Sequence, residues 1–335
     1  MYIDEDFNRE NRPERPTDVD LVQDLELDML FQAMAGDDEF LYGVARAAVL
    51  ASLDDPEPIG YRQLILQDWL ANRELLDTMY QIATSAVERR RWQYHAIGGS
   101  NPEFTLTTAL EDMHDLVSAL KALRRVLELH AEDFQSDGLT RFAAMTATEL
   151  SEEYFAEVED QLRRLRFRDG ILISARLGHG NEGLDYVLRK PSRDRPNWLD
   201  RLTGAEPPSY TYTLPPRDEA GGQVLGNLRG RGLNLVANAV AQSADHIRGF
   251  FRALREELGF YVGCLSLHDH LADNGEPIVM PTPLKAYRAG MQARDLHDPC
   301  LSLKLHGKTV GNDVDALDKA LIRAMIRTCG SPSAW

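Results

Sequence analysis

Cysteine is scarce in this sequence, and long apolar runs are absent from it. The three cysteines (Cys264, Cys300 and Cys329) cannot pair into a closed disulfide framework, which predicts a reducing compartment and a cytoplasmic protein. No stretch of about 18 uncharged apolar residues occurs, so the sequence predicts no transmembrane helix and no membrane partner. The opening residues, MYIDEDFNRENRPERP, are acidic and lack the apolar core of a secretory signal.

Sequence motifs for catalysis and metal binding are also missing. The tetrapeptide from His306 to Thr309 resembles the end of a phosphate-binding loop, but GxxxxGK[ST] requires glycine where the chain has Ser302. Cys264 and His268 are one helical turn apart, whereas His270 lies off that face. A buried cysteine beside surface histidines is therefore favoured over a zinc site. No nucleophile elbow occurs, and we predict no catalytic residue and no bound metal.

Charge is distributed unevenly along the chain. The formal net charge is −16, and residues 1–60 alone carry sixteen acidic residues against four arginines. Residues 160–232 carry thirteen Lys and Arg against nine Asp and Glu, a local balance of +4. The acidic total argues against a general nucleic-acid binder, so this middle segment is where we expect any phosphate contact.

The stretch from Asp54 to Ala83 predicts two consecutive helices that form the hub of a helical core. Asp55 is placed to cap the first orphan amides, Pro56 and Pro58 set the turn before Tyr61, and Asn72 interrupts the apolar pattern. The apolar residues recur at helical spacing on both sides of Asn72: Leu64, Leu66, Trp69 and Leu70 before it, and Leu75, Leu76, Met79, Tyr80 and Ala83 after it.

Further helical patterns cover most of the chain. An acidic, poorly ordered tail is expected over residues 1–38, with its least patterned part over residues 1–27, and a first strong helix over residues 39–53. Residues 105–134 and 139–167 each predict a helix about 40 Å long at 1.5 Å per residue. Residues 219–271 predict a returning helix whose first part Gly226, Gly230 and Gly232 should weaken or bend. Helices of this length resemble arms extending from a core.

A small β element is expected at the end of these arms, over residues 171–214. Residues 171–177, 185–190 and 211–214 have strand-like composition, and the glycine-rich residues 178–183 suit a hairpin loop.

The best candidates for a DNA contact lie at the end of the second of these strands and after it. Basic residues there are interleaved with Tyr186, Trp198 and Tyr210, a combination that can grip a phosphate backbone. The alternative is a solvated loop in which Trp198 fills a small local core. The candidate DNA-binding residues are Arg189, Lys190, Arg193, Arg195 and Arg201.

The sequence changes character again near residue 273. Residues 276–287 are proline-rich and extended, residues 294–305 are short and mixed, and residues 309–316 resemble a turn between strands. We expect residues 273–335 to begin an α/β domain, with residues 321–335 forming a tail without the pattern of a core.

Three stretches, in the same order, resemble the MutS family of DNA mismatch-repair ATPases. The hub DPEPIGYRQLILQDWLANRELLDTMYQIA resembles the hallmark of the family's helical core. Residues 231–271 resemble its returning lever helix, and VGNDVDALDKALI (310–322) resembles the entry to its ATPase domain. The resemblance covers roughly residues 39–322. It implies a mainly α fold with a core and lever domain over residues 39–272, and a part in mismatch repair or recombination control.

The departures from the family are equally specific. The P-loop (Walker A), the Mg²⁺-binding acidic strand (Walker B) and the signature loop do not occur, so the family's cofactors, ATP and Mg²⁺, are not expected in this chain and no enzyme activity is predicted. Only about 38 residues precede the core, which leaves no room for mismatch-reading and connector domains. A shift of reading frame near residue 318 would explain the unpatterned end, and a P-loop encoded downstream in another frame would support it.

These observations lead to one expected function and two alternatives. The expected function is a core and lever region that couples DNA binding to an ATPase domain absent here, with weak, non-specific binding to duplex DNA. The first alternative is a helical scaffold that binds protein partners or a second copy of itself, without a DNA or nucleotide role. The second is a truncated remnant without function.

Overall fold

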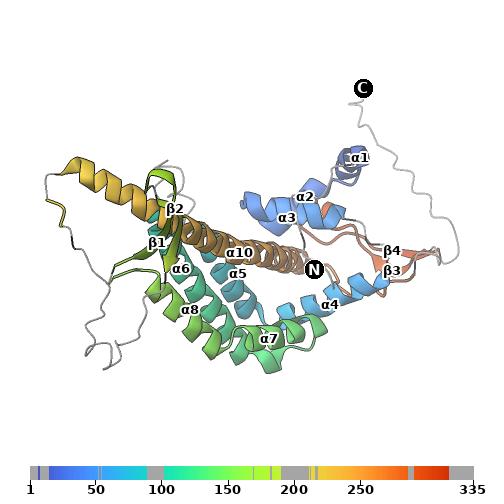
Figure 1. The fold of residues 1–335 in the computed structure, drawn as a ribbon. Helices are drawn as coiled ribbons and strands as arrows, with labels where there is room; N and C mark the ends of the chain where they lie inside the picture. The colour runs from blue at the N-terminus through green and yellow to red at the C-terminus, as the bar shows by residue number, and fades with distance from the viewer. Residues whose placement is uncertain are drawn as a thin grey trace, which may run out of the picture. The chain divides into compact units, whose positions relative to one another are not determined.

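The computed structural model is mainly helical, with two small antiparallel strand pairs, which confirms the predicted fold class (Figure 1). It describes residues 7, 15–51, 53, 55–88, 102–168, 170–181, 183–189, 211, 213–215, 218–285 and 290–316. The chain divides into two compact units. Unit 1 comprises residues 1–81, 126–145 and 253–335, and unit 2 comprises residues 82–125 and 146–252.

Unit 1 begins with three short helices, and the acidic composition concealed the first two. Helices α1 (Pro16–Asp24) and α2 (Leu27–Ala35) occupy much of the expected tail, so the prediction of a poorly ordered segment is wrong from residue 16 onward. Helix α3 (Glu39–Leu50) ends three residues earlier than expected. Phe31 and Met34 of α2 are buried and pack with Ala45 and Leu50 of α3, because one face of this acidic segment is apolar.

The hub forms the two predicted helices, α4 (Pro56–Ala71) and α5 (Arg73–Glu88). The Asp55 carboxylate accepts a hydrogen bond from the Glu57 amide at 3.1 Å, which confirms the cap, and Asn72 separates the helices as predicted. One expected core residue is wrong: Leu64 is 52% exposed, whereas its neighbour Ile65 is buried.

The predicted arm over residues 139–167 is wrong as a single helix. Helix α6 (Pro102–Leu129) is followed by the short 3-10 helix η1 (Ala131–Asp133), and then by two helices, α7 (Asp137–Glu149) and α8 (Glu152–Arg164). The side chain of Ser151 accepts a hydrogen bond from the Tyr154 amide at 3.2 Å and starts α8 anew. The pattern in α6 is confirmed, since its apolar residues at spacings of three and four are buried: Leu106, Leu110, Met113, Leu116, Leu120, Leu123 and Leu127.

The next element is a β-hairpin in unit 2. Strand β1 (Leu172–Leu177) pairs antiparallel with β2 (Gly183–Arg189), and the 3-10 turn η2 (His179–Asn181) connects them, which confirms two predicted strands and their loop. The third predicted strand is wrong: Thr211, Thr213 and Leu214 are described and lie outside any strand.

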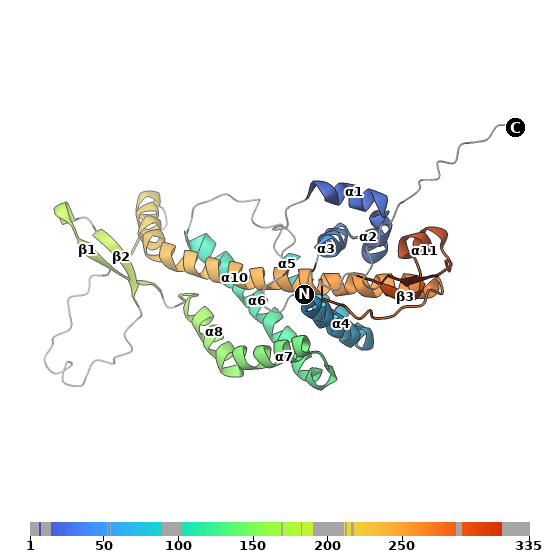
Figure 2. The same ribbon diagram turned by 90° about the vertical axis from the view of Figure 1, so that its right-hand side faces the viewer.

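Helix α10 (Glu219–Asp273) is 55 residues long, about 80 Å at 1.5 Å per residue, and contributes residues to both units (Figure 2). The three glycines in its first part do not interrupt the helix. A Cβ atom at Gly232 would lie 2.5 Å from Cδ1 of Ile173, so this glycine allows the hairpin to approach α10. Among the described helices, none has the length and low charge that spanning a membrane requires.

The C-terminal part of unit 1 contains β3 (Gln292–Leu296), α11 (Pro299–Leu305) and β4 (Asn312–Asp315). The two strands pair antiparallel, with Gln292 opposite Asp315. Residues 312–315, expected to form a turn, are therefore a strand, and the connection between the strands contains α11.

Candidate functional site

Of the five predicted DNA-binding residues, the structure describes one. Arg189 ends β2, is exposed, and donates from Nε to Ser174 Oγ at 2.8 Å across the hairpin. The other four (Lys190, Arg193, Arg195 and Arg201) lie outside the described residues.

A second group of arginines, missed as a site by the sequence reasoning, precedes the hairpin. Arg163 and Arg164 end α8, and Arg166 and Arg168 follow within four residues; all four side chains are exposed. Asp160 forms an ion pair with Arg164. We call residues 163, 164, 166 and 168 the arginine run. The sequence RRLRFR shows four arginines in six residues. We missed them as a site because the helical pattern of residues 139–167 predicted only the end of a long helix.

The arginine run leads into the hairpin, and Arg189 lies opposite Leu172 at the near end of β1. Arg176, farther along β1, is paired with Asp185 at 2.6 Å, so its charge is partly compensated. Arg231 of α10 lies over the ring of Tyr186 in β2, 5.6 Å from its centroid, and so contacts the hairpin. The arginine run and Arg189 are exposed positive charges before the hairpin and at the end of β2, and we call these five residues the basic surface of unit 2.

The hub contains no catalytic arrangement but holds a buried joint. Asp68 in α4 is buried, and its carboxylate accepts hydrogen bonds from the amides of Gln135 and Ser136 at 2.8–3.1 Å. The ring of Trp69 packs edge-on against Phe134, with 6.0 Å between centroids. Asp68 therefore fixes the turn between α6 and α7 to the hub.

Two more hub residues connect α4 to later parts of unit 1. The Arg62 guanidinium lies 5.8 Å from the ring centroid of Phe260 in α10. The Gln63 side-chain amide donates to the backbone carbonyl of Pro281 at 2.9 Å. These contacts agree with the prediction that the stretch from Asp54 to Ala83 is the hub of a helical core.

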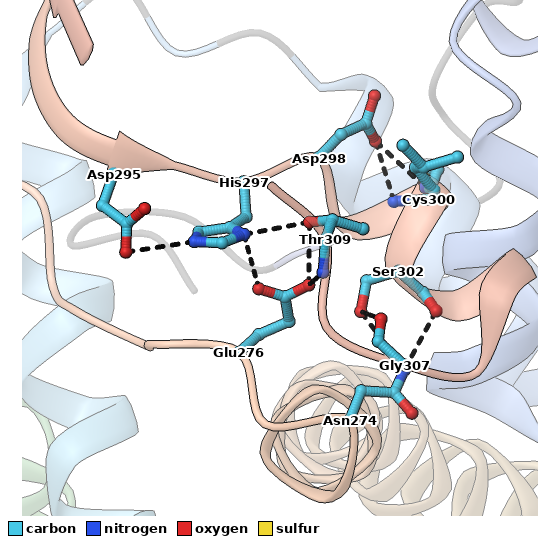
Figure 3. Close-up of polar contacts among 10 residues, drawn as sticks. Asn274, Glu276, Asp295, His297, Asp298, Cys300, Ser302, Gly307 and Thr309 are labelled. Atoms are coloured by element: carbon cyan, nitrogen blue, oxygen red, sulfur yellow. Dashed lines mark hydrogen bonds and ion pairs between the residues drawn. The ribbon is translucent and has the colours of Figure 1, made fainter. Parts of the chain in front are cut away.

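A dense polar network lies at the C-terminal end of α10 (Figure 3). Oε1 of Glu276 accepts hydrogen bonds from both the amide and the hydroxyl of Thr309, each at 2.8 Å. Oε2 of Glu276 lies 2.7 Å from Nδ1 of His297, a buried ring. Burial opposes ionisation of Glu276, but the Thr309 hydrogen bonds and the His297 charge outweigh it and lower the pKa of Glu276.

A second set of bonds in the same network joins α10 to α11. The side-chain amide of Asn274 donates to Ser302 at 3.1–3.2 Å, and Ser302 Oγ donates to the Gly307 carbonyl. The end of α10 is therefore fastened to the β3–α11–β4 segment at several points. Sequence reasoning missed this network because its members are up to 35 residues apart and follow no motif.

The network also bears on whether His306 to Thr309 could form part of a phosphate-binding loop. The amide and the hydroxyl of Thr309 are both bonded to Glu276, a carboxylate that would repel a phosphate. His306 ends α11 in the left-handed conformation, and no helix follows this loop before β4. The residues from His306 to Thr309 therefore do not fit a nucleotide phosphate.

The three candidate zinc ligands in α10 do not converge. Cys264 packs in the apolar cluster of unit 1, and burial raises the pKa of its thiol to about 12. His268 contacts Arg73 and Asp269, and His270 is exposed. Across the described residues, no three metal-ligating side chains are grouped to hold an ion.

Comparison with known protein families gives the identity of the central region. A model of the MutS2 N-terminal domain matches residues 54–274, about two thirds of the chain. The chain belongs to this family. The matched region runs from the start of the hub to the end of α10, and so includes the hairpin and the arginine run of this MutS2-type region. No curated protein and no solved structure matches the chain.

Proposed function

We propose that this MutS2-type region binds duplex DNA through the basic surface of unit 2 and passes the effect of binding along α10. The arginine run carries the proposal, because it places four exposed guanidinium groups within six residues beside a hairpin. Arginines in such a cluster neutralise phosphates and release counterions, which supports binding without sequence preference. The overall charge of −16 opposes DNA, so we expect weak binding that salt readily disrupts.

The long helix supports the coupling part of the proposal. Arg248 of α10 donates to Asp112 of α6 at 2.8 Å, and both side chains are largely buried, which ties α10 to its neighbour inside unit 2. In unit 1, α10 ends in the Glu276 network. We propose that α10, one uninterrupted helix with residues in both units, carries a displacement mechanically.

A titration of fluorescent duplex DNA at low and moderate salt tests the DNA contact. Replacing the four residues of the arginine run with Ala should weaken binding at least tenfold, since each phosphate contact contributes to affinity. A control variant removes four exposed positive charges elsewhere: Arg252, Lys285, Arg294 and Lys308. Equal loss in both variants, or no loss in either, would contradict the assignment.

A second variant tests four of the DNA-binding residues that the sequence predicts. Replacing Arg189, Lys190, Arg193 and Arg195 with Ala should also lower the affinity if these four residues share the contact with the arginine run. Unchanged affinity in this variant, together with a loss in the arginine-run variant, would restrict the contact to the end of α8.

We further propose that the chain does not hydrolyse ATP. Ser302 stands where a P-loop requires glycine, and Thr309 is committed to Glu276. An assay of phosphate release with Mg²⁺ and ATP should stay at the level of a protein-free control. Turnover that magnesium chelation abolishes would overturn the proposal.

A scaffold function has one observation in its favour. Apolar side chains in the C-terminal part of unit 1 are strongly exposed, including Val310 at 88% and Leu305 at 61%. Exposed apolar side chains favour contacts with a partner or a second copy. Concentration-dependent size in light scattering, together with no response in the DNA titration, would favour this function over DNA binding.

A further inference from the structure

A groove lies in unit 1 between the corner that joins α1 to α2 and the β3–α11–β4 segment. Its volume is about 1450 Å³. Pockets for small molecules usually measure about 300–1,000 Å³, so this groove has room for a stretch of polypeptide. Apolar side chains from both walls line it: Leu25, Leu27 and Leu30 on one side, and Leu296, Leu301 and Val310 on the other.

Both walls of the groove are fastened to the C-terminal end of α10. On one side, the Ser266 hydroxyl of α10 donates to the Ala33 carbonyl of α2 at 2.8 Å. On the other, Glu276, just after α10, holds the loop before β4 through the two hydrogen bonds described above. Lys304 of α11 pairs with Glu26 at 2.9 Å and joins the walls to each other. The groove is therefore preformed, and binding does not require its walls to become ordered.

The apolar side chains of the β3–α11–β4 wall are accessible to a partner. Val310 is 88% exposed, Leu301 43% and Leu296 39%. Removing such apolar surface from water is favourable, so the groove favours an occupant with apolar side chains of its own.

The charge of both walls together is negative. Residues 16–35, which contain α1 and α2, carry five acidic residues and no Lys or Arg, and residues 291–315 carry four acidic residues against three Lys and Arg. Among the described residues that line the groove, Asp24, Glu26 and Asp298 are acidic, and none is Lys or Arg. Lys304 compensates part of the charge of Glu26, and Asp298 also caps the start of α11 (Figure 3). This charge favours a positively charged occupant.

We propose that the groove binds a basic amphipathic segment of a partner protein. Apolar side chains of that segment fill the groove, and its Lys or Arg side chains face the carboxylates that line it. A second copy of this chain fits less well, because two chains that each carry a net charge of −16 repel each other. The proposal gives the scaffold function a location and a partner chemistry, and it does not depend on DNA binding.

Fluorescence anisotropy with three labelled peptides of about twelve residues tests the proposal on the wild-type chain. The probe combines Leu and Lys in the order of an amphipathic helix. Glu replaces every Lys in one control peptide, and Ser replaces every Leu in the other. The probe should bind roughly tenfold more tightly than either control, since one control lacks the positive charge and the other the apolar surface. Equal binding of the probe and either control would overturn the proposal.

A variant with less apolar surface locates the binding in the groove. Leu301→Ser combined with Val310→Ser should weaken binding of the Leu–Lys probe about tenfold, because two exposed apolar contacts are lost. The matched control combines Leu184→Ser with Leu235→Ser in unit 2, where the side chains are 43% and 80% exposed. This control should bind the probe like the wild type.

A second pair of variants tests the charge. Asp24→Lys should weaken binding of the probe severalfold, since it places a positive charge in the lining of the groove. Asp24 ends α1, where a positive charge is favourable for the helix, so this variant should fold. Glu149→Lys, at an exposed position in α7, changes the net charge equally and should leave the affinity unchanged.

If the groove variants bind the probe as tightly as their matched controls, the probe binds elsewhere and the proposal is wrong. Light scattering without peptide tests the other occupant. Self-association that is lost in the Leu301→Ser and Val310→Ser variant would assign the groove to a second copy and overturn the proposal of a basic partner. The arginine-run variant should bind the probe like the wild type, so the outcome is independent of the proposed DNA binding.

Discussion

Single residues in this protein act mainly by joining segments that are far apart in the sequence. Asp68 is the clearest case, since its buried carboxylate binds the amides of Gln135 and Ser136, about 67 residues away. A buried carboxylate with two amide donors satisfies backbone groups that would otherwise be left unpaired in the turn before α7. The hub is therefore defined by a carboxylate as well as by its apolar face.

Replacing Asp68 with Ala should lower the free energy of unfolding by about 2–4 kcal/mol, because two amides lose a charged acceptor in a buried site. Asp68→Asn keeps one acceptor oxygen and should cost less. Urea denaturation measures both, with Glu74→Ala on the exposed side of α5 as the control. If Asp68→Ala lowers the free energy of unfolding no more than Glu74→Ala does, the Asp68 carboxylate does not hold the turn before α7 to the hub.

The sequence predicted side-chain hydrogen bonds correctly where the donor and the acceptor are close together in the chain. The Asp55 cap was predictable because its acceptor and donor are two residues apart. The partners of Asp68 and Glu276 were not, since long-range hydrogen bonds leave no periodic signal. The arginine run was visible in the letters, but its exposure was not.

At the scale of elements, α10 and the hairpin depend on each other through Gly232. The side chain of Ile173 occupies the space where a Cβ atom at position 232 would lie. Glycine in a helix ordinarily costs about 1 kcal/mol relative to alanine, so close packing must offset that cost here.

Gly232→Ala should destabilise unit 2 by about 1 kcal/mol despite the gain in helix propensity, because Ile173 must move. Gly226→Ala is the matched control: nothing lies within 4 Å of its added Cβ, and it should stabilise the helix by about 0.5–1 kcal/mol. Thermal unfolding measures both. Stabilisation by Gly232→Ala equal to that by Gly226→Ala would show that the close approach is unimportant, and adding Ile173→Ala should remove the clash.

The predicted elements were right where one strong pattern governs a segment. The buried leucines of α6 and the two hairpin strands follow their periodicity. Residues 139–167 carry a continuous helical pattern, yet Ser151 caps a new helix within it, and periodicity alone does not reveal that break. In α2 the acidic composition outweighed a short apolar face in the prediction, although packing against α3 decides the structure.

At the scale of the whole molecule, the surface that we propose for DNA binding lies inside the region that matches the MutS2 N-terminal domain. The matched MutS2 N-terminal domain contains the hub, the hairpin and α10, and the arginine run lies within it. Composition alone favoured the opposite conclusion, because the net charge is −16. We propose that the basic surface of unit 2 binds DNA despite the negative net charge of the chain.

The most direct test of this central claim is the salt dependence of duplex DNA binding. Each phosphate neutralised on B-DNA contributes about −0.9 to the slope of log K against log salt concentration. If the arginine run contacts phosphates, replacing its four residues with Ala should make the slope less steep by about 2–4, while the four-charge control variant keeps the wild-type slope. An unchanged slope in the arginine-run variant would contradict the account.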